Sequence, residues 1–227
     1  MNELKEWTRP DRPLLLAAVS CVVLIAGAFL AAALTASDTG LFALAPEGIQ
    51  DPRGRDVIPA DRTYVFHATF YTVWATMLLS LPAFCTVWFT RRSDTAAGYW
   101  LAFWSAGLVG MLVHLYMAIG VLFEWDWQHA LSTTQRVTIP VPDLVLTLWW
   151  GVDVALGWAL MSERAKWVRL QRIVLHVALL AVFLMGFIKE GGTALSQGIG
   201  VLSALAVVAS LVMWWRKRKA RGAMAVA

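Results

Sequence analysis

Asp153 stands near the middle of an apolar run, residues 142–161, that is long enough to cross a lipid bilayer. An ionised carboxylate inside a membrane is costly, so it is usually paired, protonated or turned toward water, and it indicates a functional site. His114 lies in another apolar run at a matching depth, about 15 Å from the same membrane surface. A histidine beside a carboxylate can handle protons or bind a ligand. The sequence therefore predicts a pair between His114 and Asp153 near the midplane.

Polar and aromatic residues at helical spacing extend this candidate site. His67 and Tyr71 share one face of the run 64–89, and Thr147 and Trp150 share the face of Asp153. If these faces converge, they enclose a polar cavity that opens to the outer side of the membrane. The alternative is that these polar residues only fix how the helices pack. The candidate site residues are His114, Asp153, His67, Tyr71, Trp150 and Thr147.

Histidines also raise the question of a haem or a metal ion. His67 and His114 could hold a b-type haem between two helices, although their predicted depths differ by about 10 Å. His67, His129 and Asp126 offer nitrogen and oxygen ligands for copper or zinc near the outer surface. No sequence spacing fixes these three together. His176 is expected at a helix end, facing lipid headgroups.

The composition excludes an ordinary soluble domain. Of the 227 residues, 59% are hydrophobic and only 15% are charged. The net charge of +4 is explained by basic residues beside helix ends, so we expect a lipid bilayer and not nucleic acid as the partner. We predict one integral membrane domain over residues 1–227, an all-α bundle of six transmembrane helices. The predicted helices are residues 14–35, 64–89, 97–123, 142–161, 173–188 and 195–215.

The distribution of basic residues predicts how the helices are oriented. Of the 19 Lys and Arg residues, 14 fall on the side of the termini and 5 on the opposite side. The positive-inside rule then places both termini in the cytoplasm of a bacterial-type inner membrane, with two longer extracytoplasmic loops at residues 36–62 and 124–141. Several tryptophans, Trp100 among them, are expected in the inner aromatic belt. The first run is too long for a secretory signal and is interpreted as an uncleaved helix.

Three functions fit this pattern. The first is a transport or proton-handling protein, or the membrane subunit of a larger complex with other membrane or extracytoplasmic subunits, centred on His114 and Asp153. The second is a haem- or metal-dependent redox subunit that uses His67 and His114. The third is a structural membrane anchor. The zinc-protease, phosphate-loop and nucleophile motifs are missing from the sequence, and no stretch carries a family signature, so enzymatic activity is left open.

Overall fold

The computed structural model describes residues 10–36, 63–132, 141–161, 166–190 and 194–224. The residues within these ranges form helices and short turns, and no β-strand occurs among them. Six of the helices are long and apolar enough to cross a membrane, which confirms the predicted all-helical architecture. The elements in chain order are α1 (Asp11–Thr35), α2 (Thr63–Thr86), the 3-10 turn η2 (Val87–Phe89), α3 (Asp94–Leu115), the π-helical η3 (Tyr116–Leu122), α4 (Trp127–Ser132), α5 (Val141–Leu160), α6 (Lys166–Leu184), the π-helical η4 (Met185–Glu190) and α7 (Ala194–Met224).

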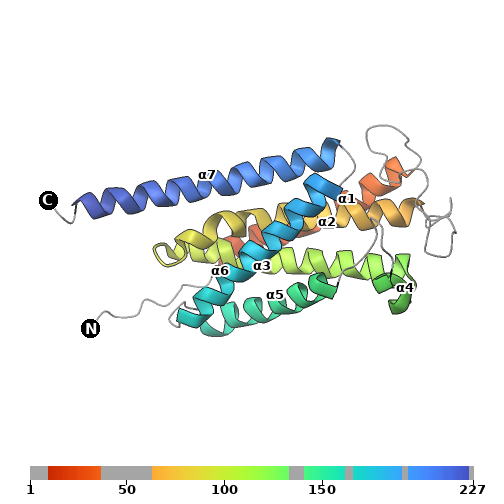
Figure 1. The fold of residues 1–227 in the computed structure, drawn as a ribbon, viewed down its shortest axis with the longest axis horizontal. Helices are drawn as coiled ribbons and strands as arrows, with labels where there is room; N and C mark the ends of the chain where they lie inside the picture. The colour runs from red at the N-terminus through yellow and green to blue at the C-terminus, as the bar shows by residue number, and fades with distance from the viewer. Residues whose placement is uncertain (1–9, 37–62, 133–140, 162–165, 191–193, 225–227) are drawn as a thin grey trace.

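Helices α2 and α3 form the centre of the bundle (Figure 1). Helix α1 packs against both of them, α5 packs against α3, and α6 lies between α5 and α7. Helix α7 runs along one edge of the bundle and α5 along the opposite edge. Large apolar side chains cover the outside, and Leu15, Leu148 and Leu202 are each more than two-thirds exposed. Such a surface is unfavourable in water, but it suits lipid.

Small and hydroxylated residues bring α2 and α3 close together. Thr76 and Ser80 donate their hydroxyl hydrogens to carbonyls four residues earlier in α2, so these polar groups are satisfied within their own helix. Gly107 and Gly110 of α3 lie against them, and a Cβ atom at Gly110 would come within 3.3 Å of the Thr76 Cα atom. Small residues at this contact allow the close backbone approach that favours helix association in membranes.

Two helices extend further than their apolar residues predict. Helix α6 begins at Lys166 and not near Ile173, and α7 continues to Met224 past the predicted end at Trp215. Both extensions carry basic residues, and the long side chains of Lys217, Arg218 and Lys219 in α7 lie near aromatic rings at the end of the apolar part. Lys217, for example, lies 5.6 Å from the centre of the Phe89 ring. Hydrophobicity alone therefore misplaced these helix ends.

The first predicted outer loop, residues 36–62, lies outside the described residues except for Ala36, and so do residues 133–140 of the second. The described part of the second loop begins where η3 ends, at Glu124 and Trp125, which adopt left-handed φ angles of 52° and 63°. The backbone N–H of Trp125 donates to the carbonyl of Ile119 at 2.8 Å, and the short helix α4 follows. These left-handed residues end the helix as C-terminal caps do.

Candidate functional site

The Asp153 carboxylate is fully buried, with 0% of the residue exposed, between α3, α5 and α6. Trp104 Nε1 on α3 donates to Oδ2 at 3.0 Å. Gln171 Nε2 on α6 donates to Oδ1 at 2.5 Å, and Arg172 Nε donates to the same oxygen at 3.2 Å. Both carboxylate oxygens therefore accept hydrogen bonds, and the ion pair with Arg172 balances the charge.

Arg172 is held by an aromatic face as well as by the carboxylate. Its guanidinium carbon lies 3.9 Å from the centre of the Trp100 ring on α3, and the residue is 0% exposed. A guanidinium over an indole face is attracted by the negative potential of the ring, and more strongly when water is excluded. The Asp153–Arg172 pair thus links α5 to α6, and Trp100 links it to α3.

His176 lies one helical turn after Arg172 and is also buried. Its Nδ1 atom is 2.8 Å from the carbonyl oxygen of Arg172, which can only accept, so Nδ1 carries a hydrogen. Its Nε2 atom accepts from Trp100 Nε1 at 2.9 Å, so the imidazole is neutral in this arrangement. The ring stacks on Trp104 with 3.8 Å between centroids and 19° between planes. The expectation that His176 faces headgroups is therefore wrong.

Tryptophan N–H groups complete the site. Trp149 donates to the side-chain oxygen of Gln171 at 2.6 Å, and Trp150 donates to the carbonyl of Trp104 at 3.2 Å. Trp100 is completely buried, which corrects its predicted place in the aromatic belt. Within this aromatic surrounding the effective dielectric constant is low, which strengthens satisfied polar contacts and penalises unsatisfied ones.

The predicted pair between His114 and Asp153 is not formed. His114 Nδ1 lies 2.8 Å from the backbone carbonyl of Thr69, on α2. Asp153 is bonded to Trp104, which precedes His114 on α3 by ten residues, or about 15 Å of helix. The two side chains thus lie at different levels, and Arg172 from α6 supplies the counterion that the prediction sought on α3.

His67 and Tyr71 form a separate polar cluster between α1 and α2. The hydroxyl oxygen of Thr35 lies 3.1 Å from His67 Nδ1 and 2.9 Å from the Tyr71 hydroxyl. Helix α3 packs against Thr76 and Ser80 of α2. Because each residue turns by ~100° around the helix axis, Thr76 points about 180° and Ser80 about 140° away from His67. His67 therefore lies on the opposite face of α2 from α3, and this geometry does not support a haem shared with a histidine of α3.

The other predicted residues do not gather into one site. Thr147 donates its hydroxyl to the carbonyl of Asp143 at 2.8 Å, within its own helix. Of the metal candidates, His67 is buried and Asp126 is exposed, while the side chain of His129 lies outside the described residues. Among the described residues, no group of three His, Cys, Asp or Glu side chains could hold a metal ion.

Sequence reasoning identified Asp153 and Trp150 but missed their main partners. The next predicted helix begins at residue 173, so Gln171 and Arg172 fall in the basic segment before it, which fits the positive-inside pattern. A usable signal was the spacing of Arg172 and His176, and of Trp100 and Trp104, at i and i+4. Residues four apart share one helix face, so each pair can present two polar groups to the same neighbour.

Comparison of the chain with protein-family models, with curated proteins and with solved structures finds no match. The function is therefore inferred from the site itself.

Proposed function

We propose that this chain is a transport or proton-handling membrane protein, or the membrane subunit of a larger complex, that works through Asp153 and Arg172. One observation carries the proposal: a fully buried ion pair joins two helices that are long enough to cross a membrane. Ionisable residues inside membrane segments are rare, and they commonly mark proton or substrate pathways.

Protonation of Asp153 would change the packing of α5 against α6. A neutral carboxyl group no longer compensates the charge of Arg172, and a buried cation without its counterion is strongly unfavourable. The guanidinium would therefore have to move toward water or another anion, which would separate the two helices. His176 could accept a second proton only if Trp100 ceased to donate to its Nε2 atom. In this proposal, the cluster acts as a two-state element controlled by protons.

We expect vesicles containing the wild-type chain to take up protons under an imposed membrane potential, and Asp153→Asn to abolish this flux. Asparagine keeps the shape of the side chain but cannot bind and release the proton. The measurement is the fluorescence of a pH-sensitive dye trapped inside the vesicles. Asp143→Asn, on the same helix but in its first turn, is the matched control and should leave the flux unchanged. The proposal would be refuted if the wild type and Asp153→Asn gave equal proton flux. It would also be refuted if the wild type gave no more flux than vesicles without protein.

A structural anchor is the second candidate, and it is favoured because both carboxylate oxygens already accept hydrogen bonds. A polar lock of this kind would fix the packing of α3, α5 and α6 without any proton transfer. It predicts that Asp153→Asn affects folding only, and that the wild-type chain gives vesicles no proton flux. The vesicle measurement therefore separates the two functions.

The proposal includes the orientation predicted from basic residues, with both termini in the cytoplasm of a bacterial-type inner membrane. Of the 14 Lys and Arg residues counted on the terminal side, 13 remain when Arg172, which is buried in the ion pair, is left out, and they support this orientation. A reporter enzyme that works only in the cytoplasm should be active when it is fused to the C-terminus. An intact but inactive fusion would show that the C-terminus lies on the opposite side of the membrane.

A further inference from the structure

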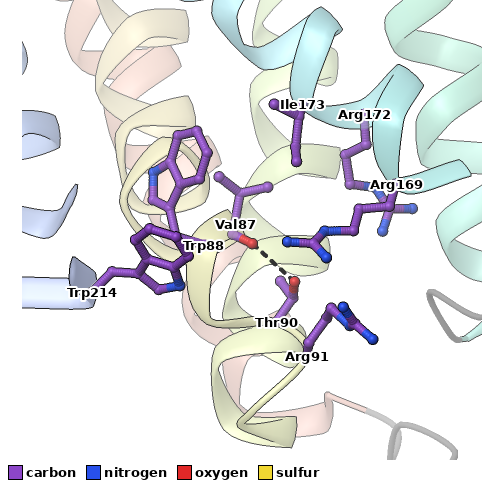
Figure 2. A pocket seen from close by; sticks show the side chains of 8 residues that line it. All are labelled: Val87, Trp88, Thr90, Arg91, Arg169, Arg172, Ile173 and Trp214. Carbon is purple, nitrogen blue, oxygen red and sulfur yellow. Dashed lines mark hydrogen bonds between the residues drawn. The ribbon is translucent and has the colours of Figure 1, made fainter. Parts of the chain in front are cut away.

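A small pocket opens at the end of the bundle where α2 ends and α6 begins (Figure 2). It holds about 300 Å³, with its open mouth included. Its walls come from η2 and the following turn, from α6, and from α7. The residues that line it are Val87, Trp88, Thr90, Arg91, Arg169, Arg172, Ile173 and Trp214.

Positive charge dominates this pocket. Three of its lining residues are arginines, and no carboxylate is among the residues that line it. Arg172 forms the inner wall and is already paired with Asp153, but within the described part of the chain neither Arg91 nor Arg169 forms an ion pair. Arg169 reaches from α6 toward Val87 and Thr90, while Arg91 rises from the turn after η2 (Figure 2). Two guanidinium groups are thus available for an anion from two different walls.

The remaining walls are apolar and aromatic. Trp88 and Trp214 lie together on the side opposite α6 (Figure 2), and both are partly buried. Tryptophan is favoured at the headgroup level of membranes, where one part of the side chain meets apolar groups and another meets water. The hydroxyl of Thr90 donates to the carbonyl of Val87 at 2.9 Å, so its hydrogen is already used. The charge of a bound anion would therefore be neutralised by the arginines.

We propose that this pocket binds a phosphate group, carried either by a lipid headgroup or by a soluble anion. A phosphate has several charged oxygens around one centre, so it can accept charge-assisted hydrogen bonds from Arg91 and Arg169 simultaneously. The open mouth leaves room for the rest of the molecule outside the pocket, beside the tryptophans. Basic pockets between membrane helices near a membrane surface recognise phosphorylated headgroups in this way. This inference does not depend on proton transfer by Asp153.

The test uses the full chain in neutral detergent, with unfolding temperature and native mass spectrometry as readouts. One arm adds inorganic phosphate, and the other adds phosphatidylglycerol, with zwitterionic phosphatidylcholine as the lipid comparison. We expect one of the two phosphate probes to raise the unfolding temperature and to remain bound in the mass spectrum. Arg91→Gln and Arg169→Gln should each weaken binding about tenfold, because each removes a charge-assisted contact. Arg216→Gln, an exposed arginine of α7 outside the pocket, should not.

The two arms identify the source of the phosphate. Saturable binding of inorganic phosphate would assign the pocket to a soluble anion, and selective retention of phosphatidylglycerol would assign it to a lipid headgroup. Binding of neither probe would overturn the proposal. An equal loss of binding in Arg216→Gln and in Arg169→Gln would also overturn it, since the effect would then arise from overall charge.

Discussion

Asp153→Asn is expected to lower the free energy of unfolding by about 3–5 kcal/mol, the range found when one partner of a buried ion pair is removed. The carboxylate accepts from Trp104, Gln171 and Arg172 in a site without solvent exposure. An asparagine oxygen can keep some of these hydrogen bonds but brings no charge. The cost therefore comes mainly from Arg172, because its cation, which lies over the Trp100 ring, loses its counterion and must either stay buried without one or move toward water and disturb the packing.

A second substitution isolates that cause. Asp153→Asn combined with Arg172→Met removes both charges and retains an apolar side chain of similar length, so most of the lost stability should return. The measurement is denaturant unfolding in micelles followed by circular dichroism, for the wild type, both single variants and the double variant. A double variant that loses as much stability as the two single variants added together would show that the charges do not interact.

Trp104→Leu is expected to have a comparable effect, about 3–5 kcal/mol, because Trp104 is the aromatic centre of the site. Its ring stacks on His176 and lies 4.5 Å from the Trp150 ring, centroid to centroid. Its N–H also donates to Asp153. The substitution thus removes packing, stacking and a hydrogen bond to a buried charge together.

Trp104→Phe separates these contributions. Phenylalanine keeps an aromatic ring beside His176 but has no N–H, so we expect a smaller loss of about 1.5–3 kcal/mol, typical of a hydrogen bond to a charged group. Trp167→Phe, at an exposed tryptophan of α6, should change stability by no more than about 0.5 kcal/mol. If Trp104→Phe were as mild as Trp167→Phe, the indole N–H would not stabilise the carboxylate.

The six helices that are long and apolar enough to cross a membrane could be predicted because their main determinant is local. A bilayer requires about 20 apolar residues in a row, and five of the six predicted runs come close to or exceed that length. The run 173–188 is shorter, and its helix reaches 23 residues only because it begins at Lys166. Asp153 was recognisable for the same reason, since a carboxylate in such a run is unusual wherever it points. The helix ends were less predictable, because the basic residues of α6 and α7 continue the helix beyond the apolar part.

The partner of Asp153 could not be derived from depth. Distance along a helix gives the level of a residue in the membrane, but each residue turns the side chain by about 100°, so the facing helix stays undetermined. His114 differs from Asp153 in level as well as in direction, because Trp104, which contacts the carboxylate, lies ten residues before it on α3, and because His114 faces the Thr69 carbonyl of α2. Arg172 pairs with Asp153, but the helix predicted over residues 173–188 leaves it in the preceding segment. Which helix faces Asp153 is decided by helix packing, and this packing depends on contacts between segments that are distant in the sequence.

Infrared difference spectroscopy of the protein in lipid, between neutral and acidic pH, tests the role of Asp153 most directly. If Asp153 takes up a proton, acidification should produce the carbonyl band of a protonated carboxyl group. We expect this band in the wild type and in Asp143→Asn, but not in Asp153→Asn. The same wild-type samples should show a change in tryptophan fluorescence, because Trp104 would lose its ionised acceptor. Identical acidification spectra for the wild type and Asp153→Asn, with the wild type still folded, would contradict the proposal and leave the ion pair a structural lock.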